Sequence, residues 1–89
     1  MASTWHLVGQ VRSSTYRERV LLALERTMTP AQLQGTIKTI SRPHFTRSLR
    51  ELQQLQLVRL LNPDTPRYHL YERTTHGNEI AQAIRKLQR

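Results

Sequence analysis

The chain has 89 residues, enough for one domain, and a domain of this size buries only roughly 60–65% of the surface that its unfolded chain exposes. Lys and Arg number 14 against six Asp and Glu, so the formal net charge is +8 and the pI about 11.4, and a polyanion is the first partner to consider. The absence of cysteine excludes disulfides, thiolate metal sites and thiol nucleophiles. No apolar run approaches the ~20 residues that span a bilayer, and no secretory leader is recognisable, so a cytoplasmic location is expected.

Residues 1–13 are expected to form an N-terminal arm ahead of a single domain over residues 14–89. The apolar residues of this arm stand among polar neighbours: Trp5, Leu7, Val8 and Val11. The pattern fits a short strand, a frayed segment or a dimer contact, and the sequence does not choose among the three.

The domain is predicted to begin with a helix capped by Ser14 or Thr15. Four apolar residues then recur on one face at helical spacing: Tyr16, Val20, Ala23 and Leu24. The pattern stops near Arg26, where this helix is expected to end.

Two further helices are predicted to follow in close succession. The first begins at Thr29, whose oxygen can cap a helix, with Pro30 at the first helical position. A new start signal comes at Ser41 and Pro43, so little chain remains between the two helices and a tight turn must join them. The second of the pair is predicted to cover residues 43–55.

This last helix has two faces of opposite character. At about 100° per residue, its apolar residues fall on one side: Phe45, Leu49 and Leu52. The opposite side carries Pro43 and three polar or cationic residues: Arg47, Arg50 and Gln54. We expect the apolar side to pack against the preceding helices and the basic side to stay exposed.

A β-hairpin and a final helix are predicted in the rest of the chain. Residues 57–61 and 67–72 have the composition of strands and flank a segment rich in Asn, Pro and Asp. After Gly77, a helix over residues 78–87 places three apolar residues on one face: Ile80, Ile84 and Leu87. The expected fold class is α+β, mostly α: a winged helix-turn-helix with a three-helix core, a two-stranded β-hairpin wing over residues 58–72 and a C-terminal helix.

Two short helices joined by a tight turn, with a cationic outer face on the second, are what reading the major groove of DNA requires. Arg47 and Arg50 suit guanine edges or phosphates, because arginine presents a planar fork of donors. Residues 27–50 include four cations and no acidic residue, which concentrates positive charge on the proposed reading unit. The candidate DNA-contacting residues are Thr29, Lys38, Ser41, Arg42, His44, Thr46, Arg47, Arg50, Gln54, Arg67 and His69.

Several short motifs carry a resemblance to a known family: Thr29-Pro30-Ala31-Gln32-Leu33, Ile40-Ser41-Arg42, the segment from Phe45 to Leu52, and Leu57-Val58. They are similar to the winged helix-turn-helix regulators of the ArsR and MarR type, most of all to the small archaeal members. The resemblance covers residues 14–87. It implies that residues 43–55 enter the major groove and that the wing near residues 64–67 reaches the minor groove or the backbone. The sequence departs from the family pattern at Gln56, where glycine is usual.

The leading hypothesis is therefore a sequence-specific, double-stranded DNA-binding transcriptional regulator that acts as a homodimer, because one recognition helix covers few base pairs. An RNA-binding or ribosome-associated winged helix, or a protein-docking winged helix, is the alternative, since phosphate attraction alone does not distinguish polyanions. No membrane partner is expected.

Other kinds of site find little support in the sequence. No enzyme is expected, because there is no nucleophile elbow, glycine-rich phosphate loop or carboxylate pair. The four histidines lack metal-ligand spacing, so no metal or other cofactor is expected, and no small-molecule ligand is evident. The aromatic residues considered for base stacking are expected mainly in the core: Trp5, Tyr16, Tyr68 and Tyr71.

Overall fold

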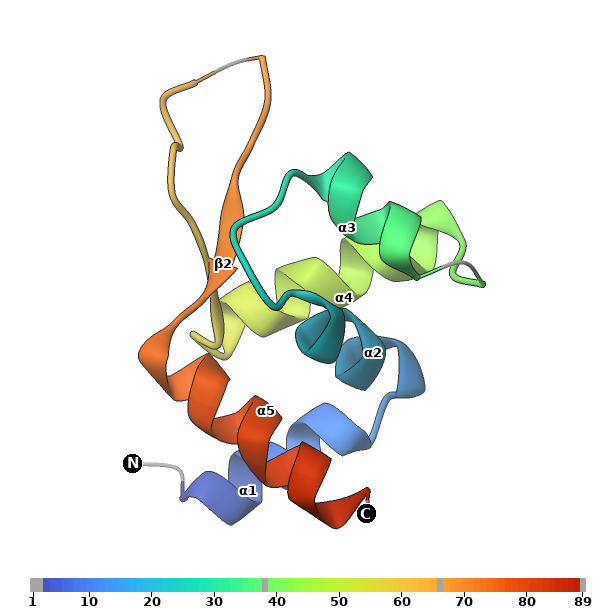
Figure 1. Ribbon diagram of the computed structural model, residues 1–89, viewed down its shortest axis with the longest axis vertical. Helices are drawn as coiled ribbons and strands as arrows, with labels where there is room; N and C mark the ends of the chain where they lie inside the picture. The colour runs from blue at the N-terminus through green and yellow to red at the C-terminus, as the bar shows by residue number, and fades with distance from the viewer. Residues whose placement is uncertain (1–2, 38, 66, 89) are drawn as a thin grey trace.

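Five helices and a two-stranded antiparallel sheet make up the protein in the computed structural model, which describes residues 3–37, 39–65 and 67–88 (Figure 1). The helices are α1 (Thr4–Arg12), α2 (Thr15–Ala23), α3 (Pro30–Thr36), α4 (Arg42–Gln54) and α5 (Thr75–Leu87). The strands are β1 (Val58–Leu60) and β2 (Tyr71–Arg73). α1 and α5 pack together at one end of the molecule, α2 lies against both α1 and α4, and the hairpin projects beyond the helices (Figure 1).

Four of the helices have a serine or threonine hydroxyl as the cap at their N-terminal end. Each accepts a hydrogen bond from the backbone N–H three residues later, which satisfies one of the amides that a helix start leaves unpaired. These capping residues are Ser3, Ser14, Thr29 and Thr74. At α3, the Thr29 N–H also donates to the Gln32 side chain at 3.0 Å, which completes a capping box. The start signals predicted at Ser14 and Thr29 are confirmed.

The core draws side chains from every helix and both strands. The largest fully buried ones include Leu21, Leu24, Leu33, Leu52, Leu57, Ile80 and Ile84. Burying a side chain of this size stabilises a fold by about 1.5–3 kcal/mol relative to leaving it exposed. The predicted apolar face of α4 is buried in this core, and Ser48 joins it. α4 is therefore held in place along one whole side.

A third segment extends the small sheet. β1 and β2 pair with Val58 opposite Arg73 and Leu60 opposite Tyr71. The Tyr71 N–H donates to the Met28 carbonyl at 2.8 Å, and the Met28 N–H donates to the Tyr71 carbonyl at 3.0 Å. The chain entering α3 is thus bonded to the edge of β2.

The N-terminal segment differs from the strand or frayed arm that the sequence allowed. It forms α1, which packs into the core through Leu7, Val8 and Val11. Its glycine, its β-branched residues and its length of nine residues give it little helical preference of its own. Contacts with α2 and α5 hold it in place, and such contacts are not visible in the local sequence.

The remaining boundaries shift by a few residues. α2 ends at Ala23 rather than Arg26, α4 begins one residue earlier than expected, and each strand has three residues. α5 begins at Thr75, so Gly77 lies in its first turn and not ahead of it. A Cβ atom placed on Gly77 would lie 2.0 Å from the carbonyl oxygen of Leu57, so a side chain does not fit at this close approach.

The turn between α4 and β1 has a glutamine, Gln56, at the position where the family pattern has glycine. Gln56 adopts a φ of 61°, in the left-handed region, which costs a residue with a side chain roughly 1–2 kcal/mol. Its carbonyl accepts a hydrogen bond from the Thr74 hydroxyl at 2.8 Å. This bond ties the turn to the residue that caps α5.

Candidate nucleic-acid interface

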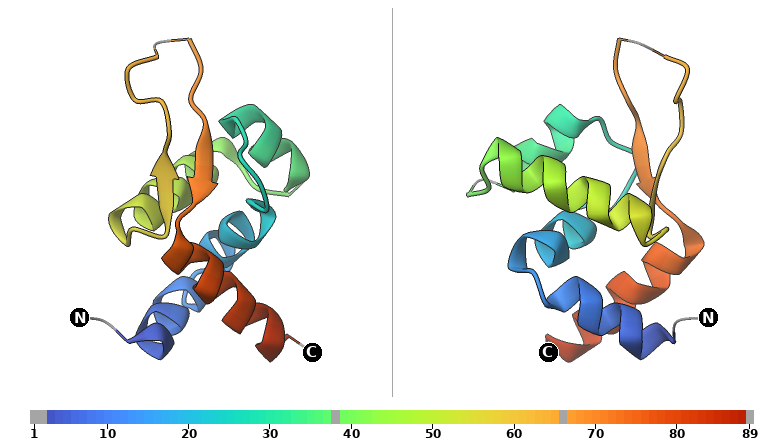
Figure 2. Two further views of the ribbon diagram at one scale, coloured as in Figure 1. Left: turned by 60° about the vertical axis from the view of Figure 1, so that its left-hand side comes forward. Right: turned by 180° about the vertical axis from the view of Figure 1, so that it is seen from behind.

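The outer face of α4 is exposed and cationic. Arg47, Arg50 and Gln54, which the sequence placed on this face, are exposed, and so is Thr46, which was predicted to contact DNA beside them. Neither the core nor α5 covers the two arginines. α4 crosses the surface of the molecule, with the hairpin rising beside its C-terminal end (Figure 2, right).

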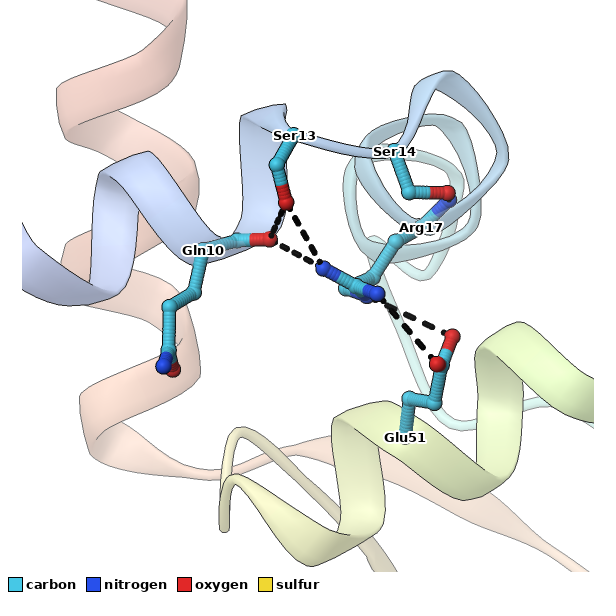
Figure 3. A network of polar contacts seen from close by, with 5 residues as sticks. All are labelled: Gln10, Ser13, Ser14, Arg17 and Glu51. Carbon is cyan, nitrogen blue, oxygen red and sulfur yellow. Dashed lines mark hydrogen bonds and ion pairs between the residues drawn. The ribbon is translucent and has the colours of Figure 1, made fainter.

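One flank of α4 is fastened to α2. The His44 ring stacks on Tyr16, with centroids 4.3 Å apart and planes within 10°. Glu51 accepts a hydrogen bond from Arg17 Nε at 3.4 Å, and its other oxygen lies 3.3 Å from Arg17 Nη2 (Figure 3). His44 thus lies at the edge of the cationic face, and the carboxylate of α4 is turned away from it.

Most acidic side chains form ion pairs with arginines that lie outside the exposed face of α4. Four pairs occur among the residues that the structure describes: Arg12–Glu18, Arg17–Glu51, Arg59–Glu72 and Arg85–Glu25. Within that part of the chain, Arg42, Arg47 and Arg50 take part in no ion pair. Their positive charge is therefore available to a polyanion.

The hairpin tip, described over residues 61–65 and 67–70, is shaped by Asn62. Its side-chain N–H donates to the Tyr68 carbonyl at 3.1 Å, and its Oδ1 accepts from the Leu70 N–H at 2.7 Å. The Thr65 N–H donates to the Asn62 carbonyl at 3.1 Å and closes a turn. Three consecutive side chains are exposed on the returning arm: Arg67, Tyr68 and His69.

Sequence reasoning missed Tyr68 as a residue of this surface. It is 56% exposed and Trp5 is 66% exposed, so the interpretation of these two aromatic residues as core is wrong. Tyr71 is buried as expected. The position of Tyr68 between Arg67 and His69, in a polar stretch after the turn, is the signal that marks it as exposed.

The other predicted residues have different surroundings. Thr29 uses its hydroxyl as the cap of α3, where it accepts from the Gln32 N–H at 3.1 Å. Ser41 and Arg42 are exposed at the start of α4, and the Ser41 side chain makes no capping bond within the described residues. Lys38 lies outside the described residues.

Another cation, Arg73, is partly buried in the fold and does not lie on the exposed face of α4. Arg73 Nη1 donates to the Leu21 carbonyl at 3.4 Å. Burial lowers the pKa of Arg73 below its usual value, and the nearby Arg85 acts in the same direction while Glu25 opposes them. Over the ranges described, no group of three or more His, Cys, Asp or Glu is placed to hold a metal ion, and no helix has the length and apolar character needed to cross a membrane.

The architecture defines a class of protein. Two helices, α3 and α4, follow each other closely along the chain, the second presents an exposed cationic face, and a β-hairpin stands beside it (Figure 2). These are the parts of a winged helix-turn-helix domain. The sequence profile of the HxlR-like helix-turn-helix family matches residues 16–89, and the chain belongs to this family. A comparison with curated protein sequences gave no match.

Solved structures share the fold. The reduced form of the transcriptional regulator YodB from B. subtilis has a TM-score of 0.79 and 19% identity, covering 99% of this chain and 88% of that one. TubR from Bacillus thuringiensis serovar israelensis, solved bound to 24 bp of tubC, has a TM-score of 0.82 and 11% identity, with coverages of 98% and 97%. A cysteine-to-serine mutant of MarR from E. coli has a TM-score of 0.71 and 24% identity, with coverages of 94% and 66%. The likeness to MarR is thus found again, whereas the ArsR likeness and the archaeal type stay predictions.

Proposed function

We propose that the protein is a sequence-specific, double-stranded DNA-binding transcriptional regulator that reads the major groove with α4. The observation that carries the proposal is the division of α4 into a face buried in the core and an opposite face with exposed arginines. A helix that enters a groove must be rigidly anchored on one side and offer donors on the other. The proposal involves binding and no catalysis.

The fold relatives support this proposal. TubR, whose structure contains 24 bp of tubC, superposes over almost the whole length of both chains. YodB is described as a transcriptional regulator. Because TubR shares the arrangement of helices and hairpin, we infer that this chain also binds DNA, and we assign the contact to α4 and the hairpin.

The residues of the face suit different contacts. Arg47 and Arg50 project from the outer stripe of α4 and are proposed to read guanine edges, with Thr46 and Gln54 beside them. Arg42, in the first turn, is proposed to hold a phosphate. The hairpin tip is proposed to lie on the adjacent backbone or minor groove, where Arg67 and His69 are the contacting residues.

We further propose that the DNA-bound form is a homodimer joined through α1 and α5. Trp5 on α1 is 66% exposed and Leu87 on α5 is 48% exposed, and both line one hollow between the two helices. Glu79 and Lys86 line the same hollow, so a second copy offers it matching apolar surface and opposite charges. Sedimentation equilibrium tests this: Trp5→Glu is expected to convert a dimer into a monomer, and a wild-type monomer would contradict it.

Fluorescence anisotropy with a labelled random-sequence duplex, titrated across a salt series, tests the function. We expect affinity to fall steeply with salt, and a preferred duplex to be selected from the random pool. Arg47→Ala and Arg50→Ala should each weaken binding to the selected duplex by roughly 1–3 kcal/mol and relax the preference for the base that each reads.

Matched variants separate contact from folding and from charge. Arg12→Ala removes one positive charge from α1, outside the proposed reading face, and should have a much smaller effect than either α4 variant. Leu49→Ala is the folding control, expected to destabilise the protein by about 2–5 kcal/mol as a core truncation. The proposal fails if Arg47 and Arg50 can both be replaced without loss of affinity at unchanged stability. A structured RNA that outcompetes duplex DNA at equal salt would also overturn it.

A further inference from the structure

Arg17 connects three helices through a single guanidinium group (Figure 3). It lies in the first turn of α2. Its Nη1 donates to the Gln10 carbonyl in the last turn of α1 and to the Ser13 hydroxyl, the latter at 3.2 Å. Its Nε and Nη2 meet the two carboxylate oxygens of Glu51 on α4, at 3.4 and 3.3 Å.

The surroundings make this connection stronger than an ordinary surface contact. The carbonyls of the last turn of a helix lack helical partners and favour a cation. The Gln10 carbonyl accepts from the Ser13 hydroxyl at 2.8 Å, and Arg17 adds a charged donor to the same oxygen. The Arg17 side chain is 17% exposed and that of Glu51 is 34% exposed. Charges shielded from water in this way are screened less by salt than fully exposed ones.

The connection depends on arginine and not on positive charge alone. Arginine presents five N–H donors in a rigid fork, so one edge can face α1 while the other faces α4. Lysine has a compact ammonium group that cannot span both sides. A second ion pair, between Arg12 and Glu18 at 2.9 Å, joins α1 to α2 without reaching α4. The chain therefore offers its own control.

We propose that Arg17 is a positioning residue that sets the direction of α4 relative to α1. The inference rests on the proposed function, in which α1 belongs to the dimer surface and α4 reads DNA. In a dimer joined through α1, the angle between α1 and α4 fixes the separation of the two reading helices. A changed angle leaves each α4 able to bind one half-site but prevents both from binding together.

Two substitutions test this with DNA. The probes are the duplex that wild-type protein selects from a random pool and the same duplex with one half-site scrambled. Arg17→Lys keeps the charge, and is expected to lower affinity for the intact duplex about tenfold but for the scrambled duplex less than about threefold. Glu51→Gln is expected to do the same, although removal of a negative charge by itself strengthens attraction to DNA.

The control and a DNA-free measurement complete the test. Arg12→Ala should change both affinities by less than about threefold. Because the chain has no cysteine, Gly9→Cys and Thr46→Cys place two spin labels on α1 and α4, at positions with open surroundings. In labelled chains diluted with excess unlabelled protein, Arg17→Lys should shift or broaden the distance between the labels, and Arg12→Ala should not.

Three results would overturn the inference or its basis, and they differ. Equal losses on both duplexes, or losses no larger than those of Arg12→Ala, would show that Arg17 does not control the pairing of half-sites. An unchanged label distance in the Arg17→Lys variant would show that it does not position α4. Failure of the wild-type protein to select any duplex would overturn the proposed function itself.

Discussion

The hairpin is held by different interactions at its root and at its tip. At the root, residues 57–60 and 71–74, Val58 and Tyr71 are buried and the backbone pairs with Met28. At the tip, residues 61–65 and 67–70, most side chains are exposed and Asn62 bonds to the opposite arm. Packing thus decides where the hairpin stands, whereas hydrogen bonds from one side chain decide the shape of its end. Substitutions in the two parts should therefore separate stability from binding.

Gly77→Ala should break the root and have the largest effect. The new Cβ would lie 2.0 Å from the Leu57 carbonyl oxygen, so backbone must move. We expect a loss of about 3 kcal/mol or more in the free energy of unfolding, measured with urea. Gly9→Ala is the matched control, because Gly9 lies inside a helix and a Cβ atom added there would have no neighbouring atom within 4 Å. This substitution should stabilise the protein by about 0.5–1 kcal/mol. Similar results for both would mean that the root is loosely packed.

Asn62→Ala should alter the tip with a smaller loss of stability. It removes the bonds to Tyr68 and Leu70, each with a net value of about 0.5–1.5 kcal/mol. Urea unfolding should therefore show a loss of roughly 1–3 kcal/mol, with a separate loss of DNA affinity. Asn78→Ala, on the exposed side of α5, is the control and should change stability by less than about 0.5 kcal/mol. A loss at Asn62 as large as that at Gly77 would erase the distinction between root and tip.

Gln56→Gly should strengthen the entry to the root. Glycine adopts the φ of 61° without the steric cost that glutamine bears, although it gains more freedom in the unfolded chain. The net gain in the free energy of unfolding should be about 0.5–1 kcal/mol by urea unfolding. Gln56→Val, a β-branched residue at the same position, should be destabilising. A loss on Gln56→Gly would mean that the glutamine side chain itself stabilises the turn.

Alkaline pH should have the smallest effect, and should act on the root. Burial raises the pKa of Tyr71 above its ordinary value of 10.0. In the unfolded chain the Tyr71 phenol loses its proton near pH 10, whereas in the folded protein burial keeps the phenol protonated to higher pH. The contribution of Tyr71 to stability is therefore complete below pH 10 and is lost as the pH rises through the folded pKa. Tyr71→Phe should reduce the fall in stability above pH 10. Tyr68→Phe, at the exposed tip, should leave that fall unchanged.

The helix-turn-helix was accessible from the sequence because its signals are local. Thr29 and Pro30 mark the start of α3, and the helical spacing of Phe45, Leu49 and Leu52 gives the buried side of α4. Once that side is known, the exposure of Arg47 and Arg50 on the opposite side follows from helix geometry.

Features that depend on contacts between distant segments of the chain could not be predicted from the sequence. α1 is held by contacts with α2 and α5, and the stacking of His44 on Tyr16 joins residues from separate helices. Gly77 signals a close approach to Leu57, but glycine before an apolar pattern is equally typical of a helix boundary. The pairing of Glu51 with Arg17 requires the angle between α2 and α4, which no local pattern specifies.

The backbone pairing of Met28 with Tyr71 has a consequence for the kind of DNA that the protein accepts. Met28 directly precedes Thr29, the cap of α3, so a tilt of the hairpin carries the beginning of the helix-turn-helix with it. In the proposed complex, the protein therefore fixes the distance between the reading helix α4 and the hairpin. The duplex must then bend or change its groove width to fit. We expect stiff and pliable duplexes with identical contacted bases to bind with different affinities.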